Sequence, residues 1–452
     1  MLTEQRCFPL LLVAWATYLI AFLILDFQKV WMHREFVDHY LASAVSHGSA
    51  FAWSDFSRAL GFMEFDRAPR PRFLSSLCLI WTAKSRLVWE KIFPPHPSLS
   101  LTWIFTLGLV PWLYFQTACR LLKDRRAAWL ALLLLLCSAG YLSGVSMLFH
   151  PAKPMAVFCI VFSLYLASRL DEGIKRRADL GWREWIGWGL LVGMVFIGFG
   201  FDETTWFILV AVPFYFSDLF LLSAKRHWIW LSWLSIFPVF LLVITFLVPR
   251  YSPGFDFWHY ALGTNQPLRS LGIRPFFANG LYLVASQLSW IRHGGWALGW
   301  VGLHAALLGW FSRSPSRDLD WRDDGRWIAV PLLFVIFDTF LLTRLMGIID
   351  TTYYYASVFP LFFSLMLARI LSRMSWRRSG LVLVYLMAIS LHHFELMNRR
   401  WRDANSAIGM PVSRTRVWEL WRESRHHRLG ASAERELILM SPGIAQELKA
   451  HD

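Results

Sequence analysis

The chain has 452 residues, of which 56% are hydrophobic and 17% are charged. Because soluble proteins carry about 25% charged residues, this composition argues against a soluble protein. Apolar runs of about 20 residues, the length that crosses a bilayer as a helix, recur along the sequence, so we expect a polytopic helical membrane protein. The net charge of +14 is assigned to arginine and lysine at the cytoplasmic ends of spans and against anionic lipid headgroups. Nucleic acid is therefore not an expected partner.

Several chemistries lack their sequence signals. The five cysteines are scattered without CxxC spacing, which indicates neither a zinc site nor a disulfide framework. The chain contains no GxxxxGKS loop and no HExxH motif, so an ATP-driven pump and a zinc metalloprotease are both poorly supported. The first apolar run lacks a small-residue cleavage site and is interpreted as a retained span rather than a signal peptide.

Hydropathy predicts about eleven transmembrane helices. Their approximate ranges are 8–26, 98–120, 127–148, 154–169, 186–201, 205–223, 228–248, 296–312, 327–343, 352–370 and 380–397. The expected fold is therefore all-α, with a transmembrane domain over residues 1–397 and a basic C-terminal tail over residues 398–452. A further apolar stretch, 276–291, is interpreted as interfacial, because counting it as a span would move the basic loops that follow it to the outside.

Basic residues are concentrated in alternate loops, which sets the orientation. The loops between them, 149–153, 202–204 and 344–351, hold almost no lysine or arginine. We therefore expect a cytoplasmic N-terminus, long external loops over 27–97 and 249–295, and an external tail. The basic clusters occur at Lys123–Arg126, Lys175–Arg177, Lys225–Arg226, 313–326 and 373–378.

One segment of the first external loop has the pattern of an amphipathic helix. In FLSSLCLIWTAKSRLVWEKI, Phe73 to Ile92, apolar residues at helical spacing alternate with Lys84, Arg86 and Glu90. A helix of this kind lies in the plane of the membrane interface. The tail segment TRVWELWRESRHHRLG, residues 415–430, predicts a second, basic amphipathic helix.

Polar residues gather at the predicted external ends of several spans, where they can face a wet cavity. A single aspartate at such an end is more often a solvated terminus, and GFDETTW can be a turn whose Asp202 and Thr204 cap the next helix. FHPAKP, residues 149–154, can likewise be only a proline-shaped turn. Their shared face favours a joint role in proton and phosphate chemistry. The candidates are Asp26, Asp38, His39, Asp66, Arg67, Arg70, Arg72, His150, Lys153, Asp202, Glu203, Asp256, His259, Arg344, Asp350 and Tyr353–Tyr355.

The segment VDHYLASAVSHGSAFAW, which begins at Val37, resembles the first-loop segment of GT-C glycosyltransferases, the group that includes protein O-mannosyltransferases and aminoarabinose transferases. Asp38 stands at the acid position, Tyr40 at the aromatic one and Gly48 at the glycine. His39 stands where the family often has a second acid, which leaves metal use open. TTYYYASVFPLFFSLMLARIL, residues 351–371, is similar to a late tyrosine- and proline-containing span of these enzymes, and the general plan of a long, partly helical first loop is shared.

The resemblance implies transfer of a sugar, with inversion, from a polyprenyl-phosphate donor to an acceptor hydroxyl on the external face of a bacterial inner membrane. Asp38 is the favoured general base and Asp26 the second candidate. Cations would stabilise the leaving phosphate, and the candidates for them are Arg67, Arg70, Arg72 and Lys153. Candidates on the substrate side are His39, Tyr40, His150, Asp202, Glu203 and Tyr353. The sugar, the acceptor (glycan, lipid or protein) and the use of a divalent metal such as Mg²⁺ or Mn²⁺ stay open.

Two other classes of function compete with this interpretation. A transporter or flippase for a lipid-linked sugar or small molecule would need charged groups inside spans, and Asp338 and His304 are the examples here. No convincing internal repeat supports that class. Another membrane transferase, of the O-antigen ligase or acyltransferase type, has only a weak signal, the adjacent His392 and His393 in the last span.

Overall fold

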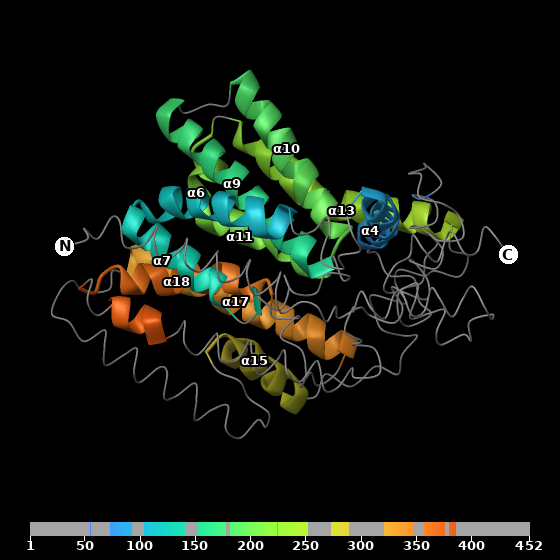
Figure 1. The fold of residues 1–452 in the computed structure, drawn as a ribbon. Coiled ribbons are helices and arrows are strands. Elements are labelled where there is room, and N and C mark those ends of the chain that lie inside the picture. Colours follow the sequence, from blue (N-terminus) through green and yellow to red (C-terminus); the bar gives the residue numbers. More distant parts are fainter. Residues whose placement is uncertain are drawn as a thin grey trace, which may run out of the picture.

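The computed structural model (Figure 1) describes eleven stretches of the chain, and every regular element in them is helical. The expected all-α class is therefore confirmed for this part of the protein. The first span, the span 296–312 and the tail lie outside the described residues, as does most of both long loops. The described residues are 55, 73–92, 104–138, 140–141, 152–177, 181–223, 225–251, 273–288, 321–346, 357–375 and 379–385.

Neighbouring helices in the bundle follow each other in the spatial order α13, α10, α9, α6, α7, α18, α17 and α15 (Figure 1). The predicted spans 154–169, 228–248 and 327–343 each lie within one helix, α9, α13 and α17 respectively. The elements are α4 (Phe73–Ile92), η2 (Ile104–Leu109), α6 (Val110–Leu122), α7 (Arg125–Leu136), α9 (Ala152–Arg177), α10 (Trp182–Phe199), η3 (Glu203–Phe207), α11 (Ile208–Tyr215), α12 (Ser217–Leu221), α13 (Arg226–Tyr251), α15 (Ile273–Leu288), α17 (Trp321–Met346) and α18 (Phe359–Leu371).

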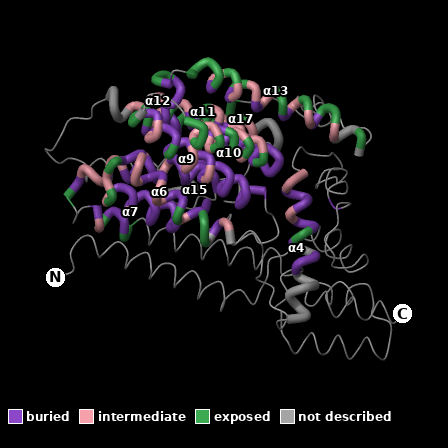
Figure 2. Tube along the Cα trace, turned by 90° about the horizontal axis from the view of Figure 1, so that it is seen from above, coloured by how far each residue is buried: buried purple, intermediate pink, exposed green. Residues whose placement is uncertain are grey.

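Two of the described helices are long and apolar enough to cross a membrane, over Ala152–Arg176 and Arg226–Leu247. They differ in surroundings: 78% of the apolar window of the first is buried inside the protein, against 28% of the second. Figure 2 shows the same contrast between the mostly buried α9 and the exposed α13. α9 is thus the centre of the bundle, and α13 presents apolar side chains outward.

The predicted span 127–148 is wrong as one continuous helix, because α7 ends at Leu136. The amide of Cys137 bonds the carbonyls of Leu133 and Leu135, which tightens the last turn. Ser138 then accepts a hydrogen bond from the amide of Tyr141 through its hydroxyl (3.3 Å), as a cap does at the start of a new turn. With twelve residues α7 is about 18 Å long, too short for a hydrocarbon core of about 30 Å.

The predicted span 205–223 is also broken, into η3, α11 and α12. Pro213 lies inside α11 and has no amide hydrogen to bond the carbonyl of Leu209, one turn earlier. The indole Nε1 of Trp233 on α13 donates to that carbonyl instead (3.1 Å). The chain then leaves helical geometry at Phe216 (φ −123°, ψ 49°), between α11 and α12. A proline therefore divides this apolar run, and a neighbouring helix satisfies the carbonyl that it releases.

Helix α4 has the bounds that the sequence predicts, Phe73–Ile92. The amide of Leu74 donates to the carbonyl of Gly200 (3.1 Å), so α4 begins against the turn that follows α10. Lys84 was expected on the polar face but is 4% exposed, because its ammonium bonds both carboxylate oxygens of Asp55 (2.7 and 2.8 Å).

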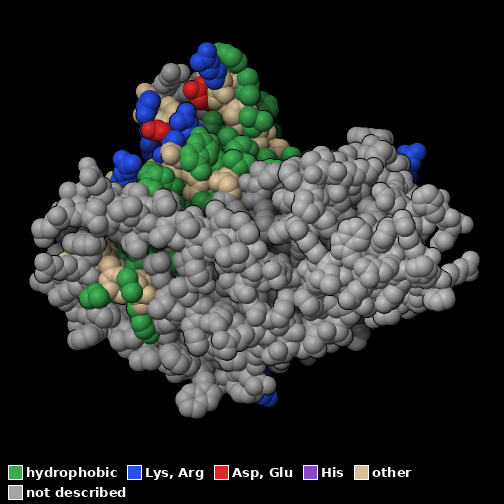
Figure 3. All heavy atoms as spheres, viewed as in Figure 1, with side chains coloured by type: hydrophobic (Ala, Val, Ile, Leu, Met, Phe, Trp, Pro, Cys, Tyr) green, Lys and Arg blue, Asp and Glu red, His purple; other side chains and the backbone are tan. Residues whose placement is uncertain are grey.

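Large apolar side chains are exposed on the outward faces of three helices. Figure 3 shows hydrophobic side chains over much of the protruding part of the surface that α10 forms. Apolar faces that are exposed in this way are typical of surfaces that contact a membrane or another protein. The side chains include Ile186, Leu190 and Ile197 on α10, Trp228, Leu231, Leu234, Val239, Leu242 and Phe246 on α13, and Leu332, Ile336 and Phe340 on α17.

Candidate functional site

The basic clusters that the sequence places on one side of a membrane meet at one end of the bundle. The ends of α6, α9, α12 and α18 and the starts of α7, α10 and α13 lie there. Three contacts join these turns: Arg126 Nη2 donates to Ser379 Oγ (2.7 Å), Arg120 Nε lies 3.4 Å from Glu172 Oε2, and Lys175 Nζ lies 3.0 Å from Asp218 Oδ2.

At the opposite end of α9 and α10 lies a buried ion pair. Lys153 in the first turn of α9 donates from Nζ to Oδ1 of Asp202 (2.8 Å), which follows the end of α10. Their side chains are 2% and 0% exposed. Lys153 is also 3.5 Å from the hydroxyl of Thr204. Two predicted candidates, one from the phosphate set and one from the substrate set, are therefore direct partners.

Asp202 has a second task in the local structure. Its Oδ1 accepts hydrogen bonds from the amide (2.9 Å) and the hydroxyl (2.6 Å) of Thr204, so Asp202 is the N-cap of η3. The capping role expected of Asp202 in GFDETTW is thereby confirmed. Glu203, the first residue of η3, is 3% exposed beside the pair. The cap holds the Asp202 carboxylate in the place where the Lys153 ammonium reaches it.

A third charged residue belongs to this group. Asp338, twelve residues after Arg326 in α17, is fully buried, and neither of its carboxylate oxygens accepts a hydrogen bond from the described residues. The charges of Lys153 and Asp202 both act on the Asp338 carboxyl. Burying an ionised carboxylate without a hydrogen-bond partner is costly. We call Lys153, Asp202 and Asp338 the buried charge cluster.

The buried charge cluster brings together two acids and one base from three elements, α9, η3 and α17. Such a group can hold a proton on Asp338 or place an ammonium toward an anion while Asp202 keeps the lysine in position. The sequence identified Asp338 as a candidate functional residue only because a charged side chain inside a predicted span is unusual. Its neighbours in the fold were not predicted.

Most predicted site residues lie outside the described part of the chain. The structure describes Lys153, Asp202 and Glu203; it pairs the first two and buries Glu203, which follows Asp202 in the chain. The others stay predictions: Asp26, Asp38, His39, Tyr40, Arg67, Arg70, Arg72, His150 and Tyr353. Within the described stretches, histidine, cysteine, aspartate and glutamate form no group of three or more that could hold a metal ion.

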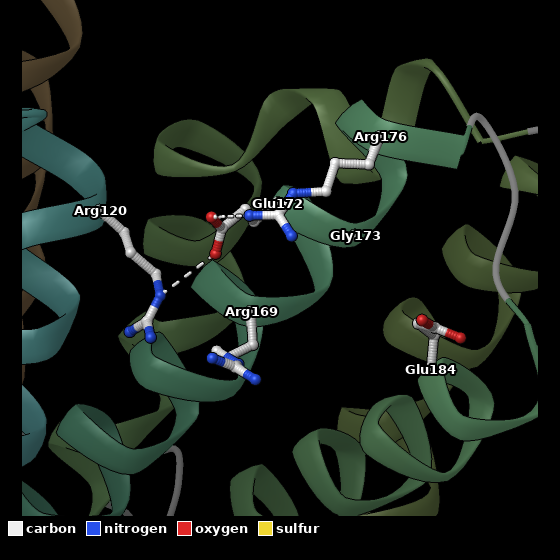
Figure 4. A pocket seen from close by; sticks show the side chains of 6 residues that line it. All are labelled: Arg120, Arg169, Glu172, Gly173, Arg176 and Glu184. Carbon is white, nitrogen blue, oxygen red and sulfur yellow. Dashed lines mark hydrogen bonds and ion pairs between the residues drawn. The ribbon is translucent and has the colours of Figure 1, made fainter.

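A second polar feature lies at the basic end, where a pocket of about 350 Å³ opens between α6, α9 and α10. Arg120, Arg169 and Arg176 gather around Glu172, and Glu184 lies apart on α10 (Figure 4). We call this the arginine pocket. In the sequence the arginines near residue 175 gave only an orientation signal, and no pocket was predicted there. It is lined by Arg120, Arg169, Glu172, Gly173, Arg176 and Glu184.

No protein-family model, no curated protein and no solved structure matches the chain. Its function is therefore argued from the residues and their geometry.

Proposed function

We propose that the chain is a polytopic membrane glycosyltransferase of the GT-C type. In this proposal the helical bundle, including the broken segments 127–148 and 205–223, crosses a bacterial inner membrane several times with the N-terminus in the cytoplasm. The protein moves a sugar from a polyprenyl-phosphate donor to an acceptor hydroxyl at the external face. The observation that carries the proposal is the division of charge along α9, with the basic turns at one end and the buried charge cluster and the start of α4 at the other.

The outward faces of α10, α13 and α17 support the membrane part of the proposal. Their exposed side chains are leucine, isoleucine, valine, phenylalanine and tryptophan, which lipid tails would cover. The exposed lysine in the last turn of α9 supports the assignment of that end to the cytoplasm, since Lys175 is 43% exposed. At the other end Lys153 is buried, whereas Arg250 at the end of α13 is exposed.

The docking of α4 supports the placement of the active site. α4 belongs to the first long loop, and its first turn bonds Gly200, two residues before Asp202. The loop that carries Asp38 and the arginines Arg67, Arg70 and Arg72 therefore leads to the end of the bundle that holds Lys153. In the proposal these residues lie at the same end of the bundle as the buried charge cluster.

The proposed reaction assigns each group one step. Asp38 takes the proton of the acceptor hydroxyl, and Asp26 is the second candidate for this base. The acceptor oxygen attacks the anomeric carbon with inversion, and the bond from that carbon to the phosphate oxygen breaks with its electron pair on the oxygen. Arg67, Arg70, Arg72 and Lys153 stabilise that charge, with Asp202 holding Lys153 in place. The sugar, the acceptor class and the use of Mg²⁺ or Mn²⁺ are left open.

The test compares Asp38→Asn and Asp26→Asn with a matched control, Asp124→Asn. Asp124 caps α7 at the basic end, and asparagine keeps such a cap. Each protein is purified in detergent, checked for intact helix content, and assayed for binding of a radiolabelled polyprenyl-phosphate sugar and for glycan product in cells. Of the three variants, we expect only Asp38→Asn to bind the donor but form no product. Normal product from folded Asp38→Asn would remove the assigned base.

A second candidate function rests on Asp338. A buried carboxyl without a hydrogen bond, beside a lysine that is already paired, is the kind of group that takes up and releases a proton in a coupled carrier. In sealed proteoliposomes, a carrier would move an intact lipid-linked sugar across the bilayer in response to a pH gradient, and Asp338→Asn would abolish that response. The transferase predicts no movement of intact donor in either protein.

A further inference from the structure

One face of α9 changes from aromatic to charged along its length. Phe158, Phe162, Tyr165 and Arg169 are spaced by four, three and four residues, so they share one stripe of the helix. The rings of Phe158 and Phe162 are stacked (5.8 Å between centroids), as are those of Phe162 and Tyr165 (6.4 Å). Trp112 of α6, which is 53% exposed, lies against Tyr165 (5.9 Å). A partly exposed aromatic seam between α6 and α9 thus leads to the arginine pocket.

The arginines at the end of this seam are held in place by their neighbours. The guanidinium of Arg120 lies 5.2 Å from the centre of the Tyr165 ring and 3.4 Å from Glu172. Arg176 donates to the other oxygen of Glu172 (2.7 Å). Arg169 is exposed, and among the described residues it has no ion pair or hydrogen bond. Three arginines against Glu172 and Glu184 leave the pocket with a formal charge of +1.

We propose that the arginine pocket binds the phosphate of an anionic phospholipid, with an acyl chain along the aromatic seam. This inference rests on the membrane location in the proposed function. Arginine pairs bind phosphate oxygens through parallel N–H donors, and basic pockets between transmembrane helices on the cytoplasmic side are suited to anionic headgroups. The lipid is favoured over a soluble phosphate because the aromatic seam adjoins the pocket, through the contact of Arg120 with the Tyr165 ring. Figure 3 shows lysine, arginine and acidic side chains gathered on the surface at this α9–α10 end.

The test uses variants that leave the packing of the bundle alone. Arg169→Gln removes a guanidinium that has no described partner, and Arg169→Gln with Arg176→Gln removes both exposed cations. Arg183→Gln is the matched control: Arg183 is exposed at the same end, against the ring of Trp182 (5.3 Å), and does not line the pocket. Each full-length protein is placed in nanodiscs of phosphatidylcholine with phosphatidylglycerol, and the retained lipid is identified by native mass spectrometry after transfer to detergent.

We expect wild type and Arg183→Gln to retain phosphatidylglycerol over phosphatidylcholine. Arg169→Gln should lower that preference about fivefold and the double variant about 25-fold, since each arginine near an anionic headgroup contributes about a factor of five. Equal retention by the folded Arg169→Gln protein would overturn the proposal.

A competition arm separates lipid from soluble phosphate. Displacement of phosphatidylglycerol by inorganic phosphate or glycerol phosphate at comparable concentration would overturn the lipid assignment and identify a soluble phosphate site. The proposed function is tested separately by carbonate extraction of membranes. A protein that stays in the membrane but shows no preference for phosphatidylglycerol contradicts this inference alone, and a protein released by carbonate contradicts the membrane location.

Discussion

Replacing Trp233 with phenylalanine removes the indole N–H that bonds the carbonyl of Leu209, which Pro213 leaves without a partner in the helix. Trp233 is 1% exposed, so water cannot easily replace it. Leaving such a carbonyl without a donor costs about 1–3 kcal/mol, and the smaller ring adds a packing loss. Pro213→Ala restores an amide hydrogen one turn after Leu209, so Trp233→Phe should cost about 1–2 kcal/mol less in that background.

Unfolding in detergent, followed by circular dichroism over a denaturant titration, gives the four free energies of this double-mutant cycle. The packing loss is common to both backgrounds and cancels. Trp230→Phe is the control. Both Trp230 and Trp233 lie on α13 and contact the ring of Phe220 (4.7 and 5.7 Å between centroids), but Trp230 does not bond Leu209. Additivity of Trp233→Phe and Pro213→Ala within about 0.5 kcal/mol would refute the role given to the indole.

Three further predictions concern the end of the bundle that holds the buried charge cluster. Lys153→Met should lower the free energy of unfolding by about 3–5 kcal/mol, because it leaves the buried Asp202 carboxylate without its cation. Adding Asp202→Asn, which keeps the cap, should recover part of that loss. If denaturant titrations show no recovery, the pairing is contradicted. Asp338→Asn should leave the protein at least as stable as wild type, since it removes a buried charge that accepts no hydrogen bond; a clear loss in the same titration would show that the charge is needed. Gly200→Ala would place a methyl carbon 2.9 Å from Leu74 Cδ1. It should therefore loosen α4 at a cost of about 1–3 kcal/mol, measured as faster proteolysis within 73–92 with the bundle intact; unchanged proteolysis would argue against the docking.

The sequence predicted those features that a local pattern determines. Helix α4 has its predicted bounds because its apolar residues recur at helical spacing over 73–92. Several of the predicted basic turns lie near one another at one end of the bundle, and their side of a membrane stays a prediction. Hydropathy missed the breaks at Ser138 and Phe216, because it sums side-chain transfer energies and does not register backbone hydrogen bonding. Ser138 and Pro213 were the visible signals for those breaks.

The features that sequence reasoning missed depend on contacts between distant residues. Lys153 and Asp202 are 49 positions apart, and both were candidates, but no local pattern states that one ammonium and one carboxylate become partners. The same holds for the arginine pocket, where Arg120 of α6 meets Glu172 of α9. The burial of Lys84 followed from Asp55, which the amphipathic pattern of α4 could not include.

The most direct test of the central claim is the fate of a labelled donor. Purified protein in sealed proteoliposomes receives a polyprenyl-phosphate sugar radiolabelled in the sugar, together with an extract of the glycans, lipids and proteins of the cell envelope as acceptors. The account predicts that the label moves to an acceptor with its anomeric configuration inverted, and that Asp38→Asn prevents this. Label that stays on the intact polyprenyl-phosphate sugar and crosses to the other leaflet would contradict the account and identify a carrier.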